Sequence, residues 1–296
     1  MRLRAQRAGV HDALEDGEEM TGPAPQDGIG AARRWRPVPA VRISLLVHAA
    51  GVAALAAEPA LWLWSLGALA ANHLVLSAAV LWPRGRLLGP NLVRLPVQAA
   101  ARNEVCLTFD DGPDPEVTPR VLDLLDAYQA KASFFCVGER AAANPHLVKE
   151  IARRGHSVEN HSYRHSRAFS FYGLLRLRRD VEATQEVITC VTGRPPKFFR
   201  APAGFRSVLL DPVLARYGLC YVSWTRRSYD TVSRDPGRIL SRLTDGLGAG
   251  DILVLHDGAL EKTHKSFVLA MLPQLLGELS RRGLRSVALP EAFRDG

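Results

Sequence analysis

Two adjacent carboxylates, Asp110 and Asp111, follow a short apolar run and precede a Gly-Pro turn. Neighbouring aspartates repel each other unless a cation or a hydrogen-bond donor gives them different roles. Further along, His161 and His165 stand at positions i and i+4, a spacing that predicts two imidazoles on one face of a helical turn. One aspartate and two histidines make a three-ligand set with open positions for water and substrate, which suits a catalytic Zn²⁺ or a similar divalent ion. Taken alone, the histidine pair is equally compatible with an ordinary surface turn.

Composition limits the classes of partner. The 296-residue chain is 47% hydrophobic and carries a formal net charge of +8. Its arginines form short scattered doublets without a basic stripe or interleaved aromatic residues, so we expect no nucleic-acid binding. Cys106, Cys136 and Cys220 lie in apolar strand-like runs and Cys190 in a helical one. This placement predicts buried free thiols rather than a disulfide framework.

The N-terminal third differs in character from the rest of the chain. Residues 1–36 lack apolar periodicity and predict a disordered tail. Residues 37–83 contain two uncharged apolar runs separated by Glu58-Pro59, and the second, at about 1.5 Å per residue, can span a ~30 Å hydrocarbon core. We therefore predict a membrane anchor of one or two transmembrane helices, with a hairpin favoured. Residues 84–103 predict a linker to a catalytic domain over residues 104–296.

Three further observations bear on this anchor. A cleaved signal peptide fits poorly, because about forty residues precede the first apolar run and a second run follows it directly. Asn72 and His73 fall near the middle of the second run and predict a helix partner there. Arginines bracket the pair of runs, so the positive-inside tendency places both ends on the cytoplasmic face, whereas a single span would place the catalytic domain outside. The bracketing residues are Arg33, Arg34, Arg36 and Arg42 before the runs and Arg84, Arg86 and Arg94 after them.

From residue 104 onward, short apolar runs alternate with helical patterns. This alternation predicts a parallel (β/α) barrel of the TIM type with about seven strands, distorted or incomplete, preceded by the transmembrane hairpin. Active sites in such barrels lie at the C-terminal ends of the strands. The predicted strands cover residues 105–109, 132–137, 156–159, 197–200, 219–224, 252–256 and 284–289.

Candidate chemical groups follow several of these strands, and we expect them on one face of the barrel. They are Asp110 and Asp111, His161 and His165, Arg200, Asp230 and His256. The segments that carry them resemble the five ordered motifs of polysaccharide deacetylases, the NodB homology domain of carbohydrate esterase family 4. The resemblance covers about residues 103–290 and rests on 108–112, 161–165, 200–204, 224–230 and 254–256.

The resemblance implies a division of labour between the two aspartates. Asp110 would be the general base that takes a proton from the attacking water. Asp111, His161 and His165 would hold a divalent metal, with Zn²⁺ preferred over Co²⁺ or Ni²⁺.

The same resemblance implies four supporting roles. Arg200 would orient Asp110, and Asp230 would keep His256 cationic as the general acid for the leaving amine. The backbone N–H of Ala203 would help to stabilise the oxyanion. Amide hydrolysis needs a nucleophile, an oxyanion stabiliser and an acid for a poor leaving group, so these roles are chemically consistent.

The sequence departs from the family pattern at three places. Thr231 follows Asp230 where the family often has Trp, and Ala203 stands where an aromatic residue is common. Arg226 and Arg227 replace an acidic residue and add positive charge near the mouth of the site. If they reach the groove, an anionic or pyrophosphate-linked glycan becomes plausible; if they point to solvent, they carry no meaning for specificity. Trp224 could line the acetyl pocket or belong to the core.

These inferences predict a metal-dependent hydrolase that removes an N-acetyl group from an amino sugar of a polysaccharide, peptidoglycan or lipid-linked saccharide. Its partners would be a glycan or glycolipid and the membrane, with the oligomeric state left open. We expect it in the inner membrane of a bacterium, with the cytoplasmic face favoured. The alternatives are an O-acyl esterase acting on a glycan and an inactive membrane-anchored glycan-binding protein.

Overall fold

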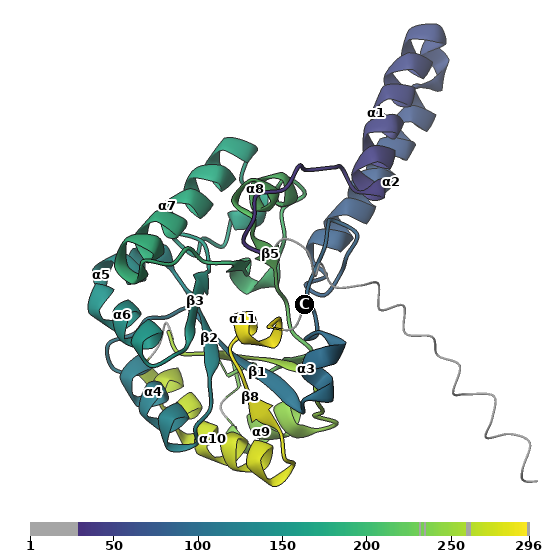
Figure 1. Ribbon diagram of the computed structural model, residues 1–296. Helices are drawn as coiled ribbons and strands as arrows, with labels where there is room; N and C mark the ends of the chain where they lie inside the picture. Colours follow the sequence, from purple (N-terminus) through teal and green to yellow (C-terminus); the bar gives the residue numbers. More distant parts are fainter. Residues whose placement is uncertain (1–28, 231, 234, 259–261, 295–296) are drawn as a thin grey trace, which may run out of the picture.

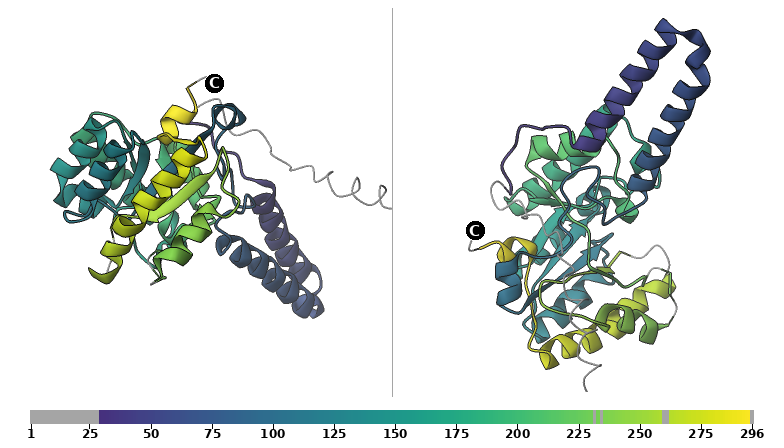
Figure 2. Two further views of the ribbon diagram at one scale, coloured as in Figure 1. Left: turned by 90° about the horizontal axis from the view of Figure 1, so that it is seen from below. Right: turned by 90° about the vertical axis from the view of Figure 1, so that its right-hand side faces the viewer.

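The computed structural model describes residues 29–230, 232–233, 235–258 and 262–294 (Figure 1). Most of the predicted tail, residues 1–28, and the departure at Thr231 lie outside the described residues. The described chain forms a barrel wrapped by helices, from which a helical hairpin projects to one side (Figures 1 and 2). A barrel preceded by two apolar helices is the predicted arrangement, and this prediction is confirmed.

The hairpin consists of α1 (Pro39–Ala57), the 3₁₀ turn η1 (Pro59–Leu61) and α2 (Trp62–Val80). Pro59 cannot continue α1, and the side chain of Glu58 accepts a hydrogen bond from the N–H of Ala60, which starts the turn. Both helices are long and apolar enough to cross a membrane. Only 0% of the residues in the first apolar segment and 6% of those in the second are buried, so the two helices do not resemble the core helices of a soluble domain.

Polar residues near the middle of the hairpin contact each other across the two helices. Asn72 Nδ2 donates to Ser44 Oγ at 3.0 Å, and the rings of His48 and His73 lie 5.2 Å apart. The helix partner predicted for Asn72 and His73 is therefore α1. Such contacts replace the hydrogen bonds to water that a lipid environment would remove.

The barrel sheet is parallel and runs in the order β5-β4-β3-β2-β1-β7-β6, with β8 paired to β1 off this path. Within the described residues no pairing joins β5 to β6, so the barrel stays open there, as predicted. The strands are β1 (Glu104–Asp110), β2 (Ala132–Cys136), β3 (Ser157–Asn160), β4 (Phe198–Phe199), β5 (Cys220–Tyr221), β6 (Arg226–Arg227), β7 (Ile252–His256) and β8 (Arg285–Ser286).

Helices cover the outside of this sheet (Figure 1). Local signals fix several of their ends: the Asp235 carboxylate caps α9 by accepting from two backbone N–H groups, and Gly193 ends α7 with a φ of 69°. They are α3 (Val97–Ala101), α4 (Thr118–Ala127), α5 (Gly138–Ala143), α6 (Pro145–Arg153), α7 (Leu174–Thr192), α8 (Leu210–Tyr217), α9 (Pro236–Thr244), α10 (Lys262–Arg281) and α11 (Leu289–Ala292), with 3₁₀ turns η2 (Phe169–Phe171) and η3 (Pro202–Gly204).

Strand β1 is buried along its whole length and divides two cores. Because side chains alternate along a strand, Leu107 and Phe109 pack outward against the helices, while Cys106 joins the cluster inside the barrel. The same alternation turns Thr108 and Asp110 inward. The strand that delivers the first candidate carboxylate is thus held on both faces.

The structure differs from the prediction for residues 29–36 and for the linker. Arg33 donates a side-chain hydrogen bond to Asp211, so this part of the predicted tail is tied to the barrel. In the linker, Leu92 pairs with Val222, the edge of β5, and Leu92 and Leu95 are buried in the interior cluster. Although the linker is rich in proline and glycine, its Leu92 and Leu95 pack into the open side of the barrel.

The cysteine prediction is correct for the redox state and wrong for one position. All four thiols are free. Cys106 and Cys136 are buried and Cys220 is half-buried, but Cys190 is exposed, because it lies on the outward face of α7.

Candidate active site

The C-terminal ends of five strands, β4, β3, β1, β7 and β6, bring the candidate residues together. Asp110 ends β1 and is in register with His256, which ends β7. Strand β3 lies beyond β2 in the sheet, and the loop that follows it carries His161. The Nδ1 atom of His161 lies 2.8 Å from the carbonyl oxygen of Arg200, which follows β4. Residues widely separated in the sequence thus meet at one edge of the sheet, where parallel-barrel sites lie.

Asp111, His161 and His165 form a compact cluster of ligand atoms, all within 4.8 Å of one another. Asp111 Oδ1 lies 3.3 Å from Nε2 of His161 and 3.0 Å from Nε2 of His165. This oxygen is buried and has no hydrogen-bond partner. Although burial favours the neutral acid, the two histidines hold the pKa of Asp111 well below its usual range, so it is a carboxylate.

The tautomer of His161 shows that this cluster fits a metal ion. The Nδ1–H group donates to the Arg200 carbonyl, which leaves the lone pair of Nε2 directed at the Asp111 carboxylate. For the neutral imidazole, two acceptors at that distance repel each other unless a proton or a metal cation lies between them. One carboxylate oxygen and two imidazole nitrogens are the donor set that Zn²⁺ and similar divalent ions prefer.

The predicted helical turn between the histidines is wrong. Residues 161–165 form an irregular loop, in which Ser162 and His165 have φ values of 63° and 48°. The two imidazoles still approach to 4.9 Å between ring centroids. The left-handed residues reverse the backbone, so the loop brings the two imidazoles together as a helical turn with i, i+4 spacing would.

Asn160, at the end of β3, holds this loop in place and was not singled out from the sequence. Its side-chain oxygen accepts from the N–H of Ser162, and its Nδ2 donates to the carbonyl of Val181 and to Gln185 Oε1. The residue is fully buried. Nothing in a lone asparagine at a strand end distinguishes it in the sequence from an ordinary turn residue.

Asn160→Ala is expected to destabilise the domain by about 2–4 kcal/mol, because it leaves buried donors and acceptors of three neighbours without partners. Denaturant unfolding of the detergent-solubilised protein measures this loss. Asn144→Ala is the matched control, since Asn144 makes one side-chain bond, to the Arg140 carbonyl, at a half-exposed position. Equal effects of the two substitutions would contradict the structural role of Asn160.

Arg200 is fully buried and binds Asp110 directly. Its Nη1 lies 2.6 Å from Asp110 Oδ1 and 2.8 Å from Thr108 Oγ1, while Nη2 donates to the carbonyl of Ser223. The guanidinium also lies 4.1 Å from the ring of Phe135. A fixed cation with several partners orients one oxygen of Asp110 and leaves the other available.

Asp230 and His256 form a second coupled pair. Asp230 Oδ1 lies 2.6 Å from His256 Nδ1, Oδ2 accepts from the backbone N–H of His256, and Ser228 Oγ donates to Oδ1. Burial alone would lower the pKa of His256, but the charge and hydrogen bond of Asp230 outweigh it and raise this pKa to about 9. The imidazole is therefore protonated at neutral pH.

The third motif forms a turn beside these groups, in which Ala203 is exposed and its neighbours are buried. Ala203 has a φ of 54°, in the left-handed region. Gly204 follows with a φ of 80°, and any side chain there would collide with the ring of Trp224. Trp224 is 7% exposed and therefore contributes to the core as well as to the wall behind this turn.

The two arginines of the fourth motif do not act alike. Arg226 turns away from the site and forms an ion pair of 2.9 Å with Asp251, which precedes β7. Arg227 lies between aromatic rings, 5.0 Å from that of Trp224 and 4.9 Å from that of Tyr229. Of the two open interpretations, Arg226 fits the one without a role in specificity.

Two further residues at the site were missed by sequence reasoning. Arg140 donates from Nη1 to the carbonyls of Asp111 and Gly258 and so joins the first and fifth motifs. Asp257 is buried against Gly112, where any side chain would collide with its carboxylate, and accepts a 2.6 Å hydrogen bond from Thr118. Its position directly after His256 is the only signal that the sequence offers.

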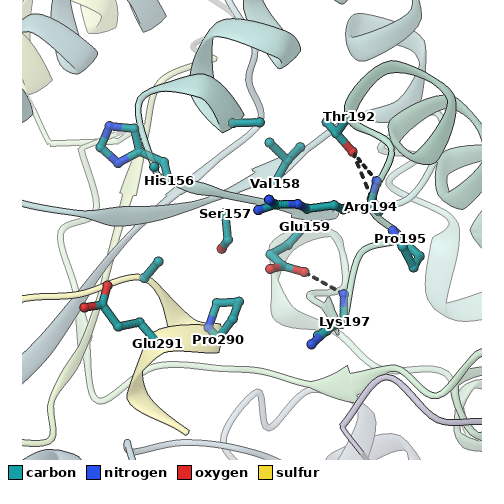
Figure 3. Close-up of a pocket in the computed structure, with 13 residues that line it drawn as sticks. His156, Ser157, Val158, Glu159, Thr192, Arg194, Pro195, Lys197, Pro290 and Glu291 are labelled. Atoms are coloured by element: carbon teal, nitrogen blue, oxygen red, sulfur yellow. Dashed lines mark hydrogen bonds between the residues drawn. The ribbon is translucent and has the colours of Figure 1, made fainter. Parts of the chain in front are cut away.

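A separate cavity of about 290 Å³ lies beside the start of β3 (Figure 3). Strand β3 begins at Ser157 and His161 follows its other end, so this cavity is on the face opposite the metal cluster. Glu159 lines it and accepts from the N–H groups of Lys197 and Phe198. His156 also lines it and accepts from the N–H of Ala132. Both side chains hold neighbouring segments together and belong to the scaffold.

Comparison with known proteins agrees with this geometry. The profile of the polysaccharide deacetylase family matches residues 98–222. A peptidoglycan-N-acetylglucosamine deacetylase of Bacillus cereus is 34% identical over 192 residues, which cover 64% of this chain and 88% of the relative. The chain belongs to the polysaccharide deacetylase family. Deacetylases of this family hydrolyse amide bonds, and the protein is an enzyme of this type.

Other family members are similar over the same extent. A chitooligosaccharide deacetylase of Sinorhizobium fredii is 32% identical over 205 residues, covering 67% of this chain and 95% of the relative. The crystal structure of a peptidoglycan N-acetylglucosamine deacetylase in complex with 4-naphthalen-1-yl-N-oxidanyl-benzamide superposes with a TM-score of 0.64 at 29% identity, covering 70% of this chain and 94% of that one. The barrel therefore has the architecture of family members with glycan substrates.

Proposed function

We propose that the protein is a membrane-anchored, metal-dependent deacetylase that removes the N-acetyl group from an amino sugar of a glycan. Three groups of side chains at one edge of the sheet carry this proposal. Asp110 pairs with Arg200, Asp111 lies beside His161 and His165, and His256 pairs with Asp230. The named relatives act on peptidoglycan N-acetylglucosamine and on chitooligosaccharides, which supports a glycan carrying N-acetylated sugars.

In this proposal Asp110 is the general base. Arg200 holds one carboxylate oxygen, and the other takes a proton from the water that attacks the acetyl carbonyl. Asp111, His161 and His165 hold a divalent ion, with Zn²⁺ preferred and Co²⁺ or Ni²⁺ as alternatives. When bound, the ion supplies Lewis-acid polarisation of the carbonyl and of the water.

The second half of the reaction needs an acid for the leaving nitrogen. His256 is protonated and held by Asp230, so its free ring nitrogen gives a proton to the amine as the C–N bond breaks. The N–H of Ala203, on the turn beside Trp224, stabilises the oxyanion. Because Asp110 and His256 are paired at the ends of neighbouring strands, base and acid are close enough to act on one scissile bond.

Two alternative functions differ from N-deacetylation in the products that they release. An O-acyl esterase would release acetate from a hydroxyl and keep the amide. A catalytically inactive glycan-binding anchor would release nothing, and the complete set of ionisable groups counts against it.

The deciding experiment incubates the full-length protein, loaded with Zn²⁺ in detergent, with N-acetylglucosamine oligomers, peptidoglycan fragments and O-acetylated glycans. We expect products that lose C₂H₂O at nitrogen and gain a free amine, detected by mass spectrometry, and a loss of turnover after chelation that Zn²⁺ restores. Release of O-acetyl groups alone would favour the esterase. Binding of a glycan without any mass change would favour the inactive anchor.

We also propose that residues 37–83 anchor the protein and that residues 104–296 carry catalysis. The hairpin returns the chain to the side from which it came, and arginines flank both of its ends. By the positive-inside tendency, the catalytic domain then lies on the cytoplasmic face of a bacterial inner membrane. The test fuses after Gly296 a reporter that is active only in the periplasm. Activity of this fusion would contradict the cytoplasmic placement.

A further inference from the structure

Both ends of the hairpin are fixed to the same corner of the barrel. Before α1, Arg33 Nη2 lies 2.8 Å from Asp211 Oδ1 and Trp35 Nε1 donates to Asp211 Oδ2 at 3.0 Å. After α2, the buried guanidinium of Arg206 donates to the carbonyls of residues 88–90. Figure 1 shows the segment that precedes α1 running from the base of the hairpin past α8. The anchor is therefore tied to the barrel before α1 and after α2.

This corner is also part of the active site. A Cβ on Gly204 would lie 3.0 Å from the ring of Pro83, the third residue after α2. Asn91 donates to the Pro83 carbonyl and accepts from Ser223 Oγ. The carbonyl of Ser223 in turn accepts from Arg200, the partner of Asp110. A short chain of contacts thus joins the end of the membrane helix to the proposed catalytic base.

Tryptophans mark where the membrane surface lies along the hairpin. Trp62 and Trp64 stand at its far end, and Trp82 stands at the barrel end with 66% exposure. Helix α2 begins at Trp62, ends two residues before Trp82 and has 19 residues, which extend about 28 Å, close to the ~30 Å hydrocarbon thickness. Tryptophan prefers the headgroup level. Pro83 follows Trp82 and lies beside Gly204, so a hairpin that spans the bilayer would place the third-motif turn at the membrane surface.

A second surface on the same side has the character of a membrane contact. Phe171 and Leu175 are 89% and 69% exposed, and Leu174 and Leu209 are exposed as well. We call these four residues the apolar rim. They precede or begin α7 and α8, the helices that follow β3 and β4, so they lie on the active-site side of the barrel.

The surroundings of the apolar rim support this reading. Ser170 donates to the carbonyl of Phe205, which links the rim to the third-motif turn. Apolar side chains flanked by arginines are typical of segments that lie in the interface of anionic membranes. Exposed arginines near the apolar rim in the sequence and after α2 include Arg84, Arg86, Arg164, Arg167 and Arg176.

We propose that the substrate is an N-acetylated amino sugar carried by a lipid in the leaflet that the catalytic domain faces. This inference rests on the proposed deacetylase function and narrows its substrate class. A sugar attached to a lipid lies in the headgroup layer, at the level of the third-motif turn.

The test reconstitutes the full-length protein with Zn²⁺ in vesicles that contain polyprenyl-diphosphate-linked N-acetylglucosamine, and compares it with a free N-acetylglucosamine oligomer. We expect kcat/KM for the lipid-linked sugar to exceed that for the free one by about tenfold or more, because the shared bilayer raises the effective substrate concentration. A flexible Gly-Ser insertion of about ten residues between Leu81 and Trp82, before the contacts of Pro83, should remove this advantage and leave turnover of the free oligomer unchanged. The same insertion between Glu58 and Pro59, at the far turn, is the matched control and should change neither.

A double variant, Phe171→Ser with Leu175→Ser, tests the apolar rim without touching buried residues. It should reduce the advantage of the lipid-linked sugar severalfold, whereas Val97→Ser, at an exposed position on α3, should not. Equal kcat/KM for the two substrates in the unmodified protein would overturn this inference and leave the deacetylase function standing. Failure to deacetylate either substrate would instead count against the proposed function itself.

Discussion

Asp110→Asn is expected to abolish turnover while metal binding persists. The amide keeps the shape of the carboxylate and can still contact Arg200, but it cannot accept a proton from the attacking water. Loss of a general base typically costs about 10²–10⁴-fold in rate. The measurement pairs kcat on an N-acetylated oligomer with the zinc content of the purified protein.

His161→Ala should lose both turnover and metal, because it removes one donor of the three-residue cluster. His146→Ala is the matched control: its imidazole lies at an exposed position on α6 and should leave both properties unchanged. Equal metal loss in Asp110→Asn and His161→Ala would contradict the division of labour between the two adjacent aspartates.

Asp230→Asn is expected to lower kcat and to move the alkaline limb of the pH–rate profile downward. A general acid works only while protonated, and the carboxylate of Asp230 raises the pKa of His256 to about 9. Activity that depends on the protonated imidazole is therefore present below that pH and lost as pH rises through it. Without the carboxylate, burial opposes the charged form, and the limb should fall by roughly two pH units toward the ordinary histidine value.

Asp235→Asn provides the charge-matched control for this experiment. Asp235 caps α9 at an exposed position, so its replacement removes one negative charge without reaching His256. Its pH–rate profile should match that of the unmodified protein. If Asp230→Asn reduced kcat at all pH values without moving the limb, Asp230 would position His256 and not set its charge.

The fold could be predicted because its signals are local and repeated. Strands β1, β2 and β7 are buried, largely apolar runs, and caps such as Asp235 and stops such as Gly193 mark the ends of helices. Strand β6 was missed, since two arginines do not resemble a strand and pair only because β7 lies beside them. The interior role of Leu92 was missed for a related reason: its partner, Val222, is distant in the sequence.

The candidate site was predicted as a set of side chains at strand ends, and the structure brings those side chains together. What could not be predicted is the support around them. Asn160, Arg140 and Asp257 act through hydrogen bonds to loops, and such bonds depend on where the backbone turns. The same limit explains the mistaken helical turn at His161, because the sequence spacing of two imidazoles does not reveal the left-handed residue between them.

The pairing of Leu92 with the edge of β5 bears on how a soluble fragment should be cut. A fragment that starts at residue 104, the predicted domain boundary, would lack Leu92 and Leu95 and expose the edge of β5 and part of the barrel interior. Uncovered strand edges and apolar surface promote aggregation. A fragment that starts near Leu88 keeps this plug and the carbonyl partners of Arg206, and is the better choice for crystallisation.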